Sequence, residues 1–138
     1  MHNQKVADNI LSNRVIGAAL EVHRRIGPGL LENIYQYCMV QELNYLGISS
    51  EVETPLQIDY RGIRLPISFR IDMLVEGELL LEFKSVVKVE QVHKAQLLSY
   101  LRLSGLRRGL LINFNVPFLR EGLFRIVNNY RPLPDTSQ

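Results

Sequence analysis

Hydrophobic residues at helical spacing predict two helices in the first third of the chain. A first helix from about 13 to 25 has an apolar stripe at steps of four, three and four, formed by Val15, Ala19, Val22 and Ile26. Residues 27–29 (Gly-Pro-Gly) end it, because neither glycine nor proline continues a helix comfortably. A second helix is predicted from about 30 to 46, closed by Gly47, with one side formed by Tyr35, Met39, Leu43 and Leu46.

Strand-like patterns follow these helices. Residues 51–60 alternate loosely and contain Pro55, which is typical of an irregular or edge strand. Residues 65–75 and 79–87 form two strands joined across Glu76-Gly77-Glu78, a short hairpin connection. The middle of the chain is therefore predicted to be mostly strand.

The last third of the chain returns to helical spacing. A helix is predicted over about 89–103, before Gly105, then a strand buried on both faces at 109–114 (GLLINF), then a helix at roughly 119–128. The expected order is helix, helix, three strands, helix, strand, helix. At 138 residues, with no repeat or low-complexity linker, we expect a single domain spanning 1–138.

Composition adds a weak constraint on partners. The chain is 46% hydrophobic and 22% charged, as in globular proteins, and its net charge of +2 neither demands nor excludes nucleic acid. A phosphate-binding surface would have to come from local clusters such as Arg24–Arg25, or Arg102 with Arg107–Arg108. The simpler interpretation of each cluster is a solvated face or a helix-end charge.

Features that do not occur in the sequence bear on the cellular location of the protein and on its enzyme class. Cys38 is the single cysteine, so no intramolecular disulfide can form, and we expect it to be a small buried residue. The first residues have no signal-peptide core, and no apolar run approaches membrane-spanning length. We therefore expect a cytoplasmic protein without a membrane partner. Glycine-rich phosphate loops, CxxC, HExxH and GxSxG motifs are absent.

Charged residues gather on one face of the predicted hairpin. If its turn centres on Gly77, Asp72 and Glu82 face each other across the ladder. Alternation then puts Lys84 on the face of Glu82, opposite Arg70. The other face would carry core residues, namely Ile71, Met73, Leu81 and Phe83.

Two carboxylates so placed suit a metal ion. Their Cβ atoms would stand about 4.5–5.5 Å apart, so the charges would repel and one group would tend to hold a proton. Mg²⁺ or Mn²⁺ removes the conflict, polarises a phosphoryl oxygen and acidifies a bound water, which Lys84 could orient. Alternatively, Asp72 with Arg70 or Lys84 forms a surface ion-pair ladder of little energetic value. The hairpin alone does not decide, and a one-residue shift would spoil the alignment.

Glu32 is a further acidic candidate. Helical spacing from Tyr35 places its carboxylate on the inward side of the second helix. Alternatively, it is a helix-start glutamate favoured by the helix dipole.

Five separated segments, spread along most of the chain, carry a family resemblance. They are Gly29-Leu-Leu-Glu32-Asn-Ile-Tyr35, Arg70-Ile-Asp72, Glu82-Phe-Lys84, Gln91-Val-His-Lys-Ala-Gln96-Leu-Leu-Ser-Tyr100-Leu and Gly109-Leu-Leu-Ile-Asn-Phe-Asn-Val-Pro117. In this order they resemble the GxxExxY protein family, a branch of the PD-(D/E)XK nuclease superfamily. The resemblance implies an α/β restriction-endonuclease-like core, a mixed β-sheet flanked by helices, with the acidic cluster at the sheet edge.

The resemblance also implies an activity and a metal site. It points to a Mg²⁺- or Mn²⁺-dependent nuclease that hydrolyses phosphodiester bonds of DNA or RNA. Asp72 corresponds to the motif aspartate, and Glu82 and Lys84 fill the E-x-K element. The metal would be held by Asp72, Glu82, the Phe83 backbone carbonyl and Glu32.

Two residues of the third helix complete the expected site. Gln96 and Tyr100 match the QxxxY motif of exonuclease-like branches, in which the glutamine approaches the lysine or the substrate. Their i, i+4 spacing places both on one helix face, although without the family they are an ordinary polar pair. Tyr100 and Arg70 are the expected substrate-binding residues. His93 is expected to be a structural or surface histidine.

Two other functions remain open from the sequence. The chain could be a non-catalytic nucleic-acid or protein-binding module that keeps the nuclease fold, although the intact Asp72, Glu82 and Lys84 argue against simple decay. It could also act mainly as a homodimer through exposed apolar helix faces, which is compatible with catalysis.

Overall fold

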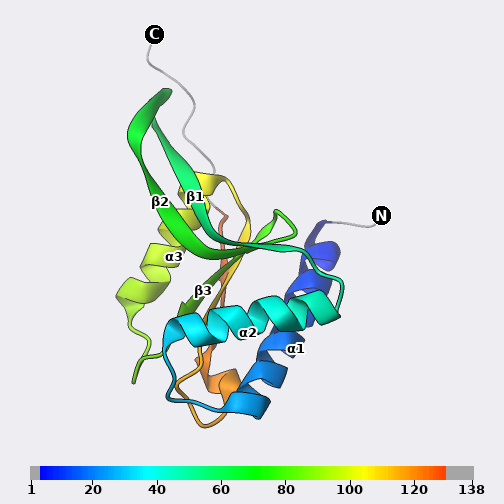
Figure 1. Cartoon of the computed structure of the whole chain (residues 1–138). Helices are drawn as coiled ribbons and strands as arrows, with labels where there is room; N and C mark the ends of the chain where they lie inside the picture. The colour runs from blue at the N-terminus through cyan, green and yellow to red at the C-terminus, as the bar shows by residue number, and fades with distance from the viewer. Residues whose placement is uncertain (1–3, 130–138) are drawn as a thin grey trace.

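Figure 1 shows the computed structural model of the chain, which describes residues 4–129. Its elements, in chain order, are α1 (Gln4–Ile26), α2 (Glu32–Tyr45), β1 (Ser50–Tyr60), β2 (Ile63–Val75), β3 (Leu79–Lys84), α3 (Gln91–Ser104), β4 (Arg108–Asn113), the 3₁₀ helix η1 (Leu119–Gly122) and β5 (Leu123–Val127). None of the described helices is long and apolar enough to cross a membrane.

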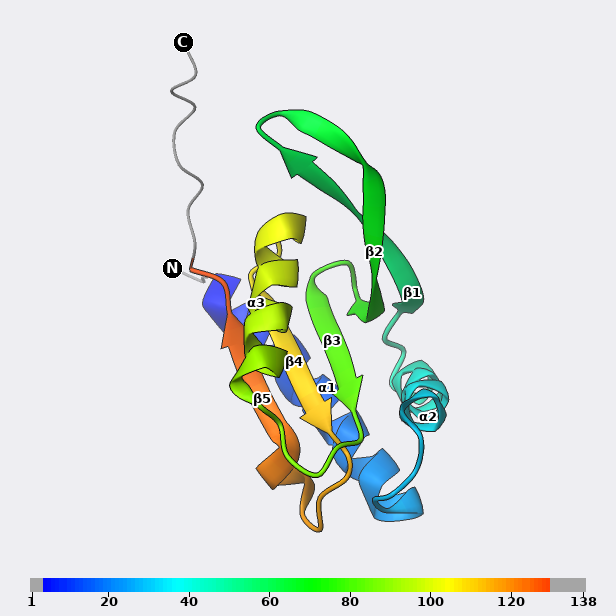
Figure 2. The same cartoon turned by 90° about the vertical axis from the view of Figure 1, so that its left-hand side faces the viewer.

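The strands form one mixed sheet in the order β1-β2-β3-β4-β5. Every neighbouring pair is antiparallel except β3 and β4, which run parallel. A parallel pair needs a crossover connection, and α3 supplies it on one face of the sheet. Figure 2 shows α3 in front of the sheet and α1 behind it.

Each face of the sheet has its own hydrophobic core. The cluster with α1 and α2 includes Val15, Tyr35, Met39, Phe83 and Phe114, whereas the cluster with α3 includes Ile71, Leu80, Leu97, Leu101 and Leu111. The central strand β3 contributes to both, so it is buried almost throughout. Lys84 is the last residue of this strand and follows directly after its buried positions.

Most expected elements are present, but the last one was wrong. Residues 119–128, expected to be helical, form η1 and then β5. The segment LFRIV pairs along the open edge of β4, from Arg108↔Val127 to Ile112↔Leu123. Phe124 and Ile126 alternate onto the α3 cluster, so ladder hydrogen bonds and burial outweigh the helical spacing. In addition, α1 begins well before residue 13, and β3 ends at Lys84 rather than at 87.

The ribbon of β1 and β2 leaves the sheet at Asp72. Strands β2 and β3 pair only from Met73↔Leu81 to Val75↔Leu79, whereas β1–β2 pairing continues to Tyr60↔Ile63. We call residues 54–70 the arm; in this part β1 and β2 pair only with each other, beyond the end of the β2–β3 ladder (Figure 2). Glu53, at its base, has a positive φ of 51°.

This bend separates two residues expected on one face. Ile71 and Met73 are both fully buried, but Ile71 packs in the α3 cluster and Met73 in the α1/α2 cluster. The expectation that they share one core was therefore wrong, because simple alternation does not survive the distortion beside Asp72.

The loop after β3 is tied to β4 through Asn113. Asn113 is 2% exposed, its Oδ1 accepts the N–H of Val86 (3.0 Å), and its Nδ2 donates to the Val86 carbonyl (3.0 Å). The chain also approaches Asn113 at Gly122, where a Cβ would stand 2.0 Å from the Asn113 carbonyl oxygen. This position has no room for any side chain.

Candidate metal and catalytic site

The turn of the β2–β3 hairpin sets the register that brings the two acidic groups together. Glu76 and Gly77 both adopt positive φ, and the strands pair as Val75↔Leu79 directly beside them. Counting outward along this register puts Asp72 opposite Glu82. The Asp72 N–H donates to Glu82 Oε1 (3.3 Å).

The side chain of Asp72 replaces a ladder bond. The Phe83 N–H donates to Asp72 Oδ2 at 2.8 Å, which fixes the carboxylate beside β3. The second oxygen of Asp72 and of Glu82 accepts no hydrogen bond from any described residue. Both carboxylates therefore keep an oxygen available for a ligand.

Burial leaves this acidic pair poorly neutralised. Glu82 is only 8% exposed, and burial together with the neighbouring charge of Asp72 raises its pKa to about 7. Burial also raises the pKa of Asp72, to which the charges of Glu32 and Glu53 add, while the hydrogen bond from Phe83 N–H acts in the opposite direction. A cation placed between the carboxylates would relieve this repulsion.

A cleft of about 480 Å³ opens beside Asp72. Glu32, Glu53 and Asp72 line it, together with Phe83 and Gln36. Glu82 and Lys84 are not part of this wall.

Glu32 reaches the cleft from the exposed start of α2. The expectation that its carboxylate turns inward with Tyr35 was wrong, since Tyr35 is fully buried and Glu32 is exposed. As the first residue of the helix, Glu32 stays hydrated where the helix dipole favours a negative charge. The same position nevertheless places it on the cleft wall with Asp72.

Two residues that the sequence analysis missed hold the cleft together. Gln36 is 9% exposed, and its Nε2 donates to the Asp72 carbonyl (2.8 Å) and to Glu53 Oε1 (3.3 Å). Gln36 lies one helical turn after Glu32, so helical spacing places both on the same side of α2. That spacing is visible in the sequence and could have identified Gln36. No sequence pattern identified Glu53, because its position depends on the bend in β1.

The two cationic candidates are placed differently. Lys84 is the last residue of β3 and is half-buried. Its positive charge partly opposes the rise in the pKa of Asp72 and of Glu82 that burial causes. Arg70 is paired with Pro55 rather than facing Lys84, and it donates to the Glu53 carbonyl at 3.3 Å. The expected Arg70–Lys84 alignment was wrong because the β2–β3 ladder ends at Met73.

Helix α3 brings Tyr100 toward the acidic pair. Its ring stacks on Phe69, with centroids 4.4 Å apart, and burial and the charges of Glu82 and Asp72 raise its pKa. Gln96, one turn earlier, is exposed and hydrogen-bonds to no residue in the described range. His93 has a structural role, as expected, because its Nδ1 accepts the Glu90 N–H at the start of the helix (2.9 Å).

The donor atoms fit a hard divalent cation in kind. Asp72, Glu82, Glu32 and the Phe83 carbonyl offer only oxygen, which Mg²⁺ and Mn²⁺ prefer. Between residues 4 and 129, however, no three His, Cys, Asp or Glu side chains stand close enough to form a ready ligand set. A metal ion at this place would need rotation of the exposed Glu32, or water, to complete its coordination.

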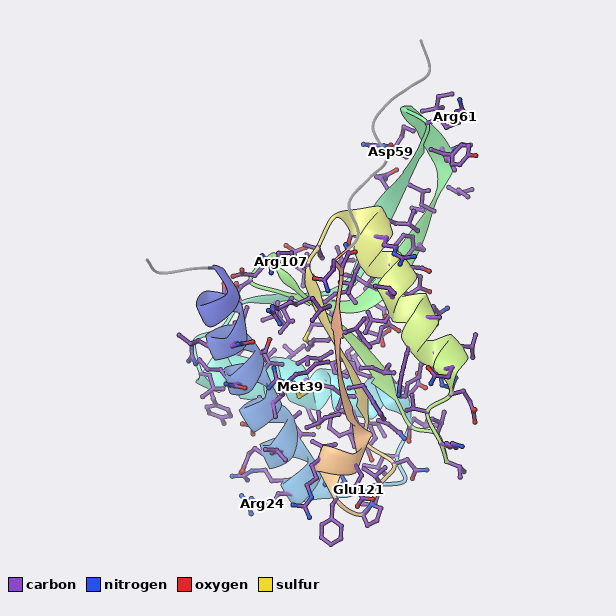
Figure 3. All side chains as sticks on the ribbon, turned by 180° about the vertical axis from the view of Figure 1, so that it is seen from behind. Arg24, Met39, Asp59, Arg61, Arg107 and Glu121 are labelled. Atoms are coloured by element: carbon purple, nitrogen blue, oxygen red, sulfur yellow. The ribbon has the colours of Figure 1, made fainter. Side chains whose placement is uncertain are left out.

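The Arg24–Arg25 pair considered as a phosphate site has a local acidic partner. Arg24 and Arg25 both bind Glu21 on α1, and these bonds lower the pKa of Glu21 to about 2. Figure 3 shows Arg24 at the end of the molecule opposite the arm. The Arg24–Arg25 pair thus matches the simpler interpretation.

Comparisons with known proteins agree with this fold. The crystal structure of SSO0001 matches with a TM-score of 0.53 and 23% identity, over 72% of this chain and 52% of that one. The chain thus spans about half the length of that protein, and a likeness at this identity supports the fold alone. No curated protein matches the sequence.

The sequence profile of the PD-(D/E)XK nuclease superfamily matches residues 9–126, a range that contains Glu32, Asp72, Glu82 and Lys84. The mixed sheet flanked by helices is the restriction-endonuclease-like α/β fold. Because the match covers most of the chain, this protein belongs to the PD-(D/E)XK nuclease superfamily.

Proposed function

We propose that this chain is a Mg²⁺- or Mn²⁺-dependent nuclease of the GxxExxY branch that hydrolyses phosphodiester bonds in DNA or RNA. The observation that carries the proposal is the buried, poorly neutralised pair of Asp72 and Glu82, joined by a hydrogen bond at the edge of a cleft. Superfamily membership implies a nucleic-acid substrate, and its members generally use divalent metals. We place this activity in a single cytoplasmic domain.

The roles follow from position. Asp72, Glu82, the Phe83 carbonyl and Glu32 would hold the metal, which when bound neutralises the carboxylates, polarises the scissile phosphate and acidifies water. The Lys84 ammonium donates hydrogen bonds to the attacking water and to the phosphate oxygen on which negative charge builds.

Three further residues would act on the substrate strand. Tyr100 and Arg70 flank the acidic pair from α3 and from the base of the arm, where they contact the substrate. Gln96 approaches the same strand or Lys84 from the exposed face of α3.

Metal binding is the first test. Calorimetric titration of Mn²⁺ should give a binding signal that disappears in Asp72→Ala. The absence of binding at millimolar Mn²⁺ or Mg²⁺ in the unchanged protein would contradict the proposal.

Cleavage is the second test. Single-stranded, duplex and branched DNA and RNA should be cut in Mg²⁺ by the unchanged protein and left intact by Lys84→Ala. Cleavage that persists unchanged in Lys84→Ala would show a contaminating nuclease.

A non-catalytic nucleic-acid-binding module is the alternative. The absence of three assembled ligands in the described residues favours it. Binding of nucleic acid without metal uptake or cleavage would support it. A homodimer formed through exposed apolar helix faces, including Tyr37 and Tyr45 of α2, is compatible with both functions and is tested by light scattering.

A further inference from the structure

The arm continues well beyond the last residue pair that joins β2 to β3. Its base is anchored, since Leu56 and Phe69 pack against the α3 cluster and Phe69 stacks on Tyr100. Its outer half is not covered: Tyr60 is 64%, Ile63 65% and Ile67 60% exposed. Figure 1 shows this part projecting past the end of α3.

The arm also carries the whole formal charge excess of the chain. The chain has 16 Lys and Arg against 14 Asp and Glu. The arm contains three arginines and one aspartate, so the remainder of the sequence holds thirteen basic and thirteen acidic residues. The site itself is acidic, so attraction for a polyanion has to come from elsewhere, and the arm has a formal charge of +2.

The tip is built around an arginine that the fold does not require. Arg61 and Gly62 form the two-residue turn between Tyr60 and Ile63, with φ of 52° and 78°. Both positions of such a turn favour Asn, Asp or Gly, so an arginine there lowers stability. Arg64 is paired with Asp59 at 2.7 Å, whereas Arg61 has no ion-pair partner in the described part of the chain.

We propose that the arm binds the sugar-phosphate backbone of the nucleic-acid substrate, with Arg61 contacting a phosphate. The arm continues from the strand that carries Asp72, so the two contacts lie on one ribbon. Nine residue steps from Asp72 to Ile63 span at most about 30 Å at about 3.3 Å per step. At about 3.4 Å per nucleotide this reaches a phosphate up to about nine nucleotides from the cleavage point.

This inference rests on the proposed function only in taking nucleic acid as the substrate, and its test does not depend on cleavage. Both variants are made in the Lys84→Ala background, so that no substrate is consumed. Arg61→Asn removes the charge and places a residue that tolerates positive φ. Arg120→Asn is the control, because Arg120 is an exposed arginine of η1, next to Glu121 at the opposite end of the molecule in Figure 3.

The measurement is the dissociation constant for 30-nucleotide single-stranded and duplex DNA and RNA between 50 and 300 mM NaCl. Each lost phosphate contact lowers the slope of log affinity against log salt by about 0.9 on duplex and about 0.7 on single strands. We expect this loss in Arg61→Asn, with an unchanged or higher melting temperature, and no loss in Arg120→Asn. A loss that appears with only one kind of nucleic acid identifies the strand form that the arm contacts.

Four results would overturn the inference. The first is an unchanged salt slope in Arg61→Asn, although the protein with Arg61 intact binds nucleic acid. The second is an equal loss in both variants, which would indicate general electrostatic attraction. The third is the absence of any binding of nucleic acid. The fourth is a dimer in light scattering that Arg61→Asn dissociates, which would assign the arm to a second copy of this chain. If the unchanged protein does not cleave nucleic acid but Arg61→Asn still shows the expected loss of slope, the proposed function is refuted and the inference about the arm stands.

Discussion

Two hollows of similar size occupy different parts of this molecule and differ in charge. The cleft at Asp72 has about 480 Å³, and a second hollow of about 560 Å³ lies between the end of α1 and η1. In the second hollow, His23 Nε2 bonds to the Val116 carbonyl (2.8 Å), and Arg24 binds Glu21. At the Asp72 cleft the carboxylates repel one another instead. Size therefore does not distinguish the candidate site from the second hollow, whereas the crowding of like charges at Asp72 does.

The largest expected effect is on activity at the first cleft. Asp72→Asn should lower the cleavage rate about a thousandfold or more, since metal binding contributes several kcal/mol to stabilising the transition state. Arg24→Gln, in the second hollow, should leave the rate within about twofold. Single-turnover rates on one substrate measure both, and comparable losses in the two variants would contradict the contrast.

The next effect is on stability as a function of pH. The pKa of Glu82 is raised from 4.5 to about 7 in the folded chain, so its contribution to stability is full below pH 4.5 and is lost as the pH rises through 7. The loss is roughly 3 kcal/mol. Urea unfolding of the metal-free protein should follow this curve, and Glu82→Gln should flatten it. A profile that Glu82→Gln does not change would assign the dependence to other groups.

The opposite sign is expected next to the second hollow. The pKa of Glu21 is lowered to about 2 by Arg24 and Arg25, so its stabilising effect is present above pH 4.5 and lost as the pH falls toward 2. Because this ion pair is exposed, salt should weaken it.

A smaller effect is expected for the amide that connects α2 to β2. Gln36→Leu should weaken Mn²⁺ affinity about tenfold, because residues that orient ligands typically contribute 10- to 100-fold. The rate at saturating Mn²⁺ should recover, which a general loss of structure would not allow. Gln41→Leu, an exposed glutamine of the same helix, is the matched control and should leave the affinity unchanged.

The smallest effect is expected in the second hollow. His23→Ala should lower the free energy of unfolding by about 1 kcal/mol, the value of one hydrogen bond, without changing the cleavage rate. A rate loss above tenfold would show that this hollow also serves catalysis.

The hairpin could be predicted from the sequence because its constraints are local. Gly77 fixes the turn, and a turn fixes the register of the strands beside it, so the meeting of Asp72 and Glu82 followed from counting. Most helices and strands followed from periodicity in the same way, whereas the α/β class came from the family resemblance. Positions set by contacts within about ten residues were therefore accessible.

What the sequence did not reveal depends on distant contacts. Strand β5 forms because the edge of β4 is open, and no local pattern records that edge. Glu53 reaches the cleft, and Ile71 separates from Met73, because the ribbon bends where α2 and α3 approach it from either side. Glu32 was identified as an acidic candidate, but its exposure depends on where the helix begins.

Gly122 has a consequence for mutational surveys of this protein. Any side chain there would overlap the Asn113 carbonyl, and Asn113 holds the loop that follows Lys84. In a saturation library scored by survival of activity, position 122 would thus tolerate as few replacements as Asp72 does, though it touches neither metal nor substrate. Measuring soluble yield as well as activity would separate the two positions. Changes at position 122 should lower both soluble yield and activity, whereas changes at position 72 should lower activity alone.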